Sequence, residues 1–185
     1  MLTAKAFGAV LVLLSFLECG GITNRITPTS GTDRTTPSAE PTPASIPKDL
    51  SITLERGACF GTCPQYSVTI TSDGSVQFES KRNTKIQGKA SGKITQDELK
   101  TLVVEFGKMK FFNLKDRYTD EACPEIATDM PSATVTYTYN GKTKEVFHYF
   151  GCVTTDKREP YPPGLNLLEN KIDEIAKTDQ WVREK

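Results

Sequence analysis

The sequence contains a single histidine, His148, and no excess of charge of either sign, since 23 basic residues balance 23 acidic ones. A second histidine is missing, so the His-Glu-x-x-His metalloprotease motif cannot form. A Gly-x-Ser-x-Gly elbow and a glycine-rich phosphate-binding loop are absent too. Nucleic-acid binding needs a surplus of lysine and arginine to neutralise phosphates, so the balanced charge argues against a nucleic-acid partner. These absences favour a protein that is not an enzyme and that carries no cofactor.

Long hydrophobic runs are scarce, and the main one, residues 6–17, lies at the N-terminus. Twelve residues are too few for a membrane span of about 20, but they fit the apolar region of a signal peptide, which has about 7–15. Cys19 follows and resembles the lipidation site of bacterial lipoproteins. That family has leucine and a small residue where this chain has Phe16 and Glu18. We predict a signal peptide over residues 1–19, with acylation of Cys19, secretion without lipid, or an uncleaved anchor as the alternatives.

Residues 20–49 are rich in threonine and proline and poor in large apolar side chains. Such a segment cannot bury enough surface to offset the entropy lost on ordering, so it is expected to be a disordered linker. The sequence therefore predicts one folded domain over residues 50–185, exported to the bacterial envelope, where it is either tethered to a membrane or free in the periplasm or medium.

The first regular hairpin is predicted from alternating apolar residues on either side of Asp73-Gly74. A two-residue loop would place Ile70 opposite a glutamine and mix the two faces. A three-residue loop, residues 72–74, places Ile70 opposite Val76 and keeps the apolar side chains on one face. Gly74 is then expected to take a left-handed conformation in a bulge.

A second hairpin is predicted at Asn140-Gly141, a strong signal for a two-residue turn. This turn pairs Val135 with Val146. The same register places His148 opposite Ala133, on the face that carries both valines. His148 is accordingly expected to be a strand residue, either satisfied by a neighbour or at the surface.

Two helices are predicted from apolar residues at helical spacing. Thr95 and Glu98 form a capping box, which indicates a helix from Gln96 to Lys108. A closing helix follows the prolines at 162 and 163. Residues 51–56 also alternate as one short strand, whereas residues 83–93 alternate only weakly. We predict an α+β domain with a mostly antiparallel sheet of four to five strands and two helices packed on one face.

Four cysteines lie in the predicted domain, namely Cys59, Cys63, Cys123 and Cys152. An even number of cysteines in an exported chain indicates two disulfides, for which three pairings are possible. Cys59 and Cys63 can close a tight loop. The second hairpin, if it continues, places Cys152 opposite Asp129, six residues after Cys123. We therefore favour the pairing Cys59–Cys63 with Cys123–Cys152.

A copper or thiol-redox site is the competing interpretation of Cys59 and Cys63. The Cys-x-x-x-Cys-Pro pattern resembles the copper-binding loop of Sco-type assembly proteins, which use one distant histidine as well. Thiolates suit Cu(I), and His148 would be the third ligand. That family has a thioredoxin-like fold, however, which the order of strands and helices here does not match. A four-cysteine zinc site is disfavoured, because the spacing does not provide two Cys-x-x-Cys knuckles.

The stretch from Cys59 to Tyr66, Cys-Phe-Gly-Thr-Cys-Pro-Gln-Tyr, resembles the opening signature of an uncharacterised family of bacterial exported proteins and lipoproteins. The likeness extends over roughly residues 50–177 and implies an envelope location, but no mechanism. We expect a non-enzymatic, disulfide-stabilised binding or structural module. Its partners would be a membrane, through lipid on Cys19, and an unknown protein or cell-wall ligand. The alternative is a Cu(I)-binding or thiol-redox protein.

Overall fold

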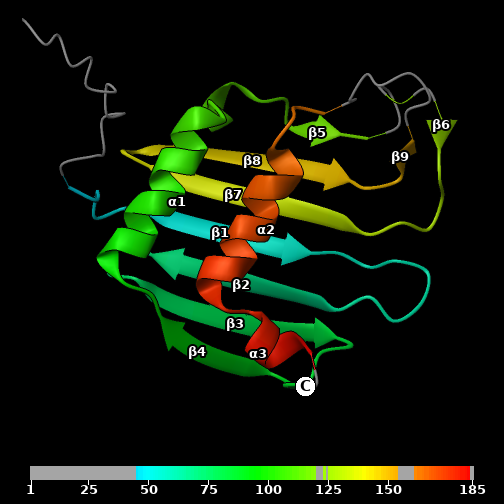
Figure 1. The fold of residues 1–185 in the computed structure, drawn as a ribbon, viewed down its shortest axis with the longest axis horizontal. Helices are drawn as coiled ribbons and strands as arrows, with labels where there is room; N and C mark the ends of the chain where they lie inside the picture. Colours follow the sequence, from blue (N-terminus) through cyan, green and yellow to red (C-terminus); the bar gives the residue numbers. More distant parts are fainter. Residues whose placement is uncertain (1–44, 120–122, 124, 154–160, 184–185) are drawn as a thin grey trace, which may run out of the picture. The chain divides into compact units, whose positions relative to one another are not determined.

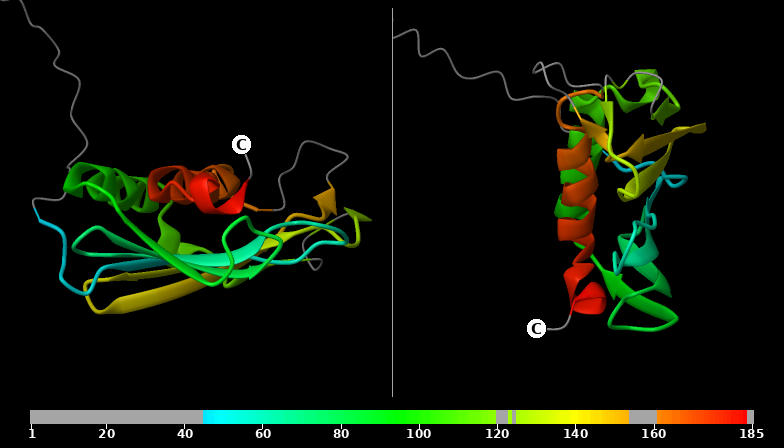
Figure 2. Two further views of the ribbon diagram at one scale, coloured as in Figure 1. Left: turned by 90° about the horizontal axis from the view of Figure 1, so that it is seen from below. Right: turned by 90° about the vertical axis from the view of Figure 1, so that its right-hand side faces the viewer.

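The computed structural model describes residues 45–119, 123, 125–153 and 161–183. In these residues one twisted sheet forms a layer, and the helices lie together on one of its faces (Figure 1). The side views in Figure 2 show no helix on the opposite face of the sheet. None of the described helices is long and apolar enough to span a membrane.

The main sheet has seven strands in the order β4-β3-β2-β1-β7-β8-β5. Neighbouring strands are antiparallel, except that β5 runs parallel to β8. The strand bounds in chain order are β1 (Ser51–Arg56), β2 (Gln65–Thr71), β3 (Ser75–Arg82), β4 (Lys89–Lys93), β5 (Arg117–Tyr118), β7 (Ser132–Tyr139) and β8 (Lys142–Tyr149). The first strand of the domain is thus the central one.

A separate two-stranded ribbon and three helices complete the described fold. The ribbon consists of β6 (Glu125–Ile126) and β9 (Cys152–Val153). The helices are α1 (Gln96–Lys108), α2 (Leu165–Ala176) and the short α3 (Asp179–Val182), with a 3-10 turn at Phe111–Asn113.

The α+β class and the mostly antiparallel sheet are confirmed, but the predicted numbers of four to five strands and two helices are too low. The additional strands β5, β6 and β9 have two residues each, and α3 has four. A periodic pattern needs several repeats to be recognised, so elements of this length leave no signal in the sequence.

Both predicted hairpin registers are confirmed. Ile70 pairs with Val76 across the loop of residues 72–74, and Gly74 has φ = +81°. Val135 pairs with Val146 and Ala133 with His148. Alternation of apolar and polar side chains was sufficient to fix both registers, because a slip by one residue would move every apolar side chain to the wrong face.

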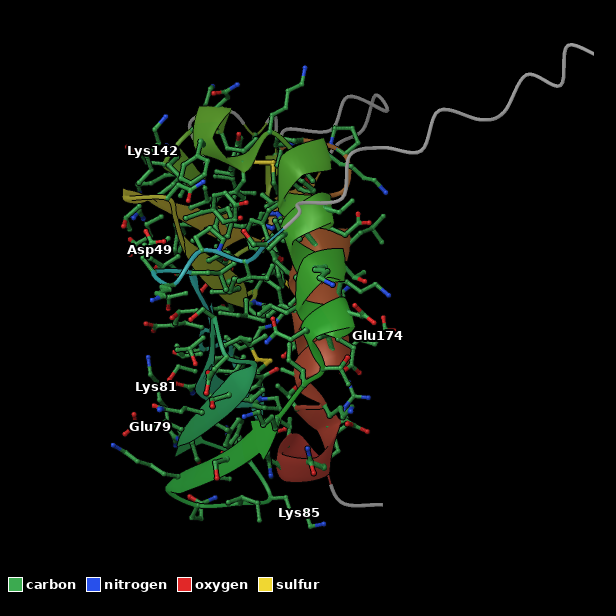
Figure 3. The ribbon with its side chains drawn as sticks, turned by 90° about the vertical axis from the view of Figure 1, so that its left-hand side faces the viewer. Asp49, Glu79, Lys81, Lys85, Lys142 and Glu174 are labelled. Carbon is green, nitrogen blue, oxygen red and sulfur yellow. A yellow bond between two sulfur atoms is a disulfide. The ribbon has the colours of Figure 1, made fainter. Side chains whose placement is uncertain are left out.

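The core lies between the sheet and the helices. The apolar residues of β1, β2, β3, β7 and β8 face α1 and α2, while the opposite face carries mainly threonine, serine and charged residues. Figure 3 shows Glu79 and Lys81 on that open face, away from the helices.

The predicted capping box of Thr95 and Glu98 is present, and α1 begins at the predicted residue, Gln96. Phe78 is 1 % exposed, and its ring packs against that of Trp181.

Two glycines in hairpin turns provide a matched test of the fold. Gly74 and Gly141 both have positive φ, but a Cβ at Gly74 would lie 2.5 Å from the carbonyl oxygen of Ile94, whereas a Cβ at Gly141 meets nothing within 4 Å. We expect Gly141→Ala to lower the free energy of unfolding by about 1–2 kcal/mol through backbone strain alone. Gly74→Ala should cost about 1–3 kcal/mol more, because of the overlap. Urea denaturation of both variants measures the difference, and equal costs would contradict it.

Candidate functional site

Four residues on neighbouring strands form a row at one end of the sheet, on the face that packs against the helices. Arg56 pairs with Tyr66 on one side and with Ala133 on the other. Ala133 in turn pairs with His148. Paired residues in a sheet point to the same face, so Tyr66, Arg56 and His148 lie side by side with only the small Ala133 interrupting them. We call these four residues the polar row.

Helix α2 places two carboxylates over the polar row, one turn apart. Nδ1 of His148 donates a hydrogen bond to Oε1 of Glu169 at 2.9 Å. Nε and Nη2 of Arg56 both donate to Oδ2 of Asp173, at 2.9 Å and 2.8 Å. Nη1 of Arg56 also lies 3.7 Å from Oε2 of Glu169, which links the two pairs. Arg56 and His148, the two nitrogen-bearing side chains of the polar row, thus each have one carboxylate of α2 as a hydrogen-bond partner.

Asp173 is the centre of the hydrogen-bond network. Its Oδ1 accepts hydrogen bonds from the hydroxyls of Tyr66, at 2.7 Å, and Thr178, at 2.8 Å. Burial, followed by the charge of Asp173, raises the pKa of Tyr66 above its ordinary value of 10.0. Burial is the largest single effect and would lower the pKa of Arg56, but the charge and hydrogen bonds of Asp173, with the charges of Tyr66 and Glu169, together raise it. Arg56 therefore stays cationic and Tyr66 stays a neutral donor.

The His148–Glu169 pair is the most deeply buried part of this network. Both side chains are 1 % exposed, and the rings of Phe150 and Tyr161 pack against the imidazole, at centroid distances of 4.7 Å and 4.2 Å. Among the described residues, Nε2 of His148 and Oε2 of Glu169 have no hydrogen-bond partner. No hydroxyl or thiol of these residues donates to His148, so the pair lacks the nucleophile of a hydrolytic triad. The arrangement is suited to holding α2 on the sheet.

A shallow hollow of about 250 Å³ lies beside the network. Arg56 and Asp173 line it on one side, and Cys63 and Pro64 line it on another. The Cys59–Tyr66 motif therefore borders the buried charges directly, because its last residue, Tyr66, belongs to the polar row. This contact explains why the motif leads into β2 at a fixed position.

Both disulfides of the favoured pairing are present. Cys59 is bonded to Cys63 with a Cα–Cα distance of 5.7 Å, and Cys123 to Cys152 with 5.4 Å. The predicted position of Cys152 opposite Asp129 is wrong, since Cys152 pairs with Ile126. Asp129 has φ = +64°, which turns the chain before β7 begins and ends the simple register of the hairpin.

Backbone hydrogen bonds join the two disulfide-bonded segments into one end of the molecule. The amide of Phe60 donates to the carbonyl of Asp129 at 2.9 Å, and that of Gly57 donates to Ser132 at 2.8 Å. The hydroxyl of Tyr149 accepts from the amide of Met130 and donates to the carbonyl of Ala127. We call residues 57–64, 123 and 125–131, with β9, the disulfide end.

Large apolar side chains are exposed on the disulfide end. Phe60 is 87 % exposed, Met130 41 % and Ile126 40 %, which makes three of the five exposed large hydrophobic residues in the described part of the chain. Each lies next to a cross-link or a hydrogen-bonded backbone, so the apolar atoms are held outwards by a constrained chain. An exposed apolar group of this kind is a common feature of protein-binding surfaces.

The structure does not bring together the three ligands of the alternative copper site. Cys59 and Cys63 are bonded to each other, and His148 is hydrogen-bonded to Glu169 beneath α2. Across the described ranges, no three histidine, cysteine or acidic side chains are grouped so that they could hold a metal ion. Cys19, the predicted lipidation site, lies outside the described residues.

Sequence reasoning missed Arg56, Glu169 and Asp173, although the pattern contained a signal for two of them. Arg56 continues the inward-facing alternation of β1, and Glu169 lies within the apolar stripe of α2, four residues after Leu165 and three before Ile172. A charged residue at a position that the pattern assigns to the core predicts a buried partner.

The buried pair can be tested with a double-mutant cycle. His148→Leu leaves the Glu169 carboxylate without its partner, and Glu169→Met leaves the imidazole without an acceptor. Each change should lower the free energy of unfolding by about 3–5 kcal/mol, and the double variant should lose clearly less than the sum. Urea denaturation gives the three values. Thr101→Ala, at an exposed position of α1, is the control and should change stability by about 0.5 kcal/mol or less. Strictly additive losses would contradict the coupling.

Comparison with known proteins assigns the domain to a family. No curated protein matches the chain. Residues 50–176, which make up more than half of the sequence, match one family whose function is not known. This span contains the polar row, both disulfides and the two α2 carboxylates that contact the row, Glu169 and Asp173. The chain therefore belongs to the family described as Domain of unknown function (DUF6438).

Proposed function

We propose that this protein is a non-enzymatic binding module that is exported, anchored to a membrane by lipid on Cys19, and bound to a protein partner through the disulfide end. The observation that carries the proposal is the exposure of Phe60, at 87 %, on a loop closed by the Cys59–Cys63 bond. Aromatic residues are enriched among those that dominate binding energy at protein interfaces. A constrained loop loses little conformational entropy when it binds, which favours affinity.

The composition of the disulfide end supports a protein as the partner. Phe60, Ile126 and Met130 are exposed apolar residues of this end, and Glu125 and Asp129, which neighbour Ile126 and Met130 in the sequence, are exposed as well. A polar rim around an apolar centre is the usual organisation of a protein–protein interface. The partner is therefore expected to offer an apolar pocket for Phe60.

The buried network supports a non-enzymatic role. The histidine and glutamate that could transfer protons are both 1 % exposed, and the hydrogen bond between them occupies one nitrogen of the imidazole. Acid–base catalysis requires contact between such groups and a substrate, which burial prevents. The polar row instead positions α2 and the strand that leads into the disulfide end.

The geometry of the chain supports a tethered arrangement. The chain enters β1 at Ser51 and leaves it at Arg56, after which the disulfide end begins. A six-residue strand is about 20 Å long, so the entry point and the binding end are separated along the sheet. Two disulfides also suit an oxidising compartment outside the cytoplasm. A partner could then bind without contact with the membrane at the tether.

Binding through the disulfide end can be tested by photo-crosslinking in the cells that make the protein. A photoreactive amino acid at Met130 should give a discrete cross-linked protein. Phe60→Asp in the same chain should reduce that product at least tenfold, because the apolar contact is lost. The control is Gln77→Asp, which introduces the same charge at an exposed position of β3 that belongs to neither the disulfide end nor the helical layer, and it should leave the product unchanged. An unchanged product with Phe60→Asp would contradict the proposal.

The tether can be tested by labelling cells with a radioactive fatty acid. The protein should carry label and sediment with membranes, because acylation of Cys19 adds an apolar chain to the N-terminus of the mature protein. Cys19→Ala should abolish the label. Glu18→Ala is the control, since it retains Cys19 and should retain the label. A wild-type protein without label would rule out the lipid anchor, while leaving binding through the disulfide end to be judged by the cross-linking result.

A further inference from the structure

A groove lies on the helical layer, lined by the C-terminal end of α1, by α2 and by the residues that directly precede α2. Its volume is about 770 Å³. Met109, Leu167, Leu168 and the prolines at 162 and 163 form its apolar part. Figure 1 shows α1 and α2 side by side in front of the sheet, and Figure 3 shows Glu174, which lines the groove, pointing outwards from this layer. The groove is therefore open to the surroundings of the domain.

Leu167 is the apolar side chain that projects beside this groove. It is 72 % exposed, whereas its neighbours Leu165 and Leu168 are 0 % and 3 % exposed and pack into the core. At helical spacing, residue 167 lies off the stripe that α2 presents to the sheet, so the core does not require a leucine there. A projecting apolar side chain and an apolar groove thus occupy the same small area of the surface.

The charges around the groove are balanced on each side. On α1, Lys108 pairs with Glu105 at 3.2 Å; on α2, Lys171 pairs with Glu174 at 2.7 Å. Each wall therefore has one acidic and one basic residue. Two such surfaces can approach with opposite charges facing each other, and the net charge of zero means that the chains as a whole do not repel.

From these observations we propose that the α1–α2 groove is a self-association surface, in which two copies of this protein pack about a two-fold axis and Leu167 of each copy enters the groove of the other. A two-fold interface uses the same patch on both copies, so it needs a patch that is complementary to itself. A projecting leucine next to an apolar groove, with balanced charges on both walls, meets that requirement.

The exposed edge of the sheet is less suited to self-association. β4 lies at one edge and has lysine at both ends, Lys89 and Lys93. If two copies paired antiparallel along β4 about Ser91, Lys89 of each would lie opposite Lys93 of the other. Like charges at paired positions are destabilising, and lysines on edge strands commonly prevent such pairing. Pairing of two copies along the β4 edge is therefore disfavoured.

Sedimentation equilibrium of the purified chain over a concentration series tests the proposal, with Cys19→Ala in every variant so that no acyl chain contributes. The wild-type surface should show a monomer–dimer equilibrium. Leu167→Asp should lower the association constant at least tenfold, because it removes the projecting apolar group and places an unpaired charge in the interface. Phe60→Asp is the matched control: it changes an exposed apolar residue of the disulfide end and should leave association unchanged.

Three results would overturn the proposal. The first is a protein with the wild-type surface that stays monomeric at concentrations up to about 1 mM, a range that covers even weak association. The groove would then be left for a helix of another protein. The second is a dimer that persists in Leu167→Asp, which would place the interface elsewhere. The third is a dimer that is lost in Phe60→Asp, which would show that two copies associate through the disulfide end. Cross-linking from Met130 to a second copy would then confirm that interface.

Discussion

The alignment of two hydrogen-bonded pairs between the sheet and α2, one deeply buried and one partly buried, is the constraint on which the rest of the structure depends. Arg56 and His148 come from different strands, and their partners Asp173 and Glu169 lie one turn apart on α2. Both pairs form only if the sheet register and the rotation of α2 are correct at the same time. A shifted register or a rotated helix would leave charges buried without partners, at a cost of several kcal/mol. An apolar core alone tolerates such shifts more easily, so the polar row makes the packing of α2 specific.

Hairpins were the part of the fold that the sequence predicted best. Ile70 opposite Val76 and Ala133 opposite His148 follow from alternation and turn residues, which act over a few residues. The strand order was not predictable in this way, because β1 pairs with β7 across most of the domain. The row of Tyr66, Arg56 and His148 exists only in that long-range order. The predicted strand position of Cys152, opposite Asp129, was wrong for a local reason, the left-handed turn at Asp129, although the predicted Cys123–Cys152 bond is present.

The two proposed surfaces lie on different parts of the domain. Phe60 belongs to the disulfide end, beyond the C-terminal end of β1, and Leu167 belongs to the outer side of the helical layer. Their local support also differs, since covalent bonds hold the first and helix packing holds the second. One surface could therefore be occupied without blocking the other. A dimer formed through the helices would present two disulfide ends, which would raise the apparent affinity for a partner that is itself repeated or clustered.

The central position of β1 has a consequence for the order of folding. β1 is the first strand to leave the ribosome, but its neighbour β7 follows only after β2, β3, β4 and α1 have been made. Pairings between residues distant in sequence form slowly, because the intervening chain must be ordered before the contact stabilises it. The nascent chain therefore cannot close its sheet until most of the domain has been synthesised.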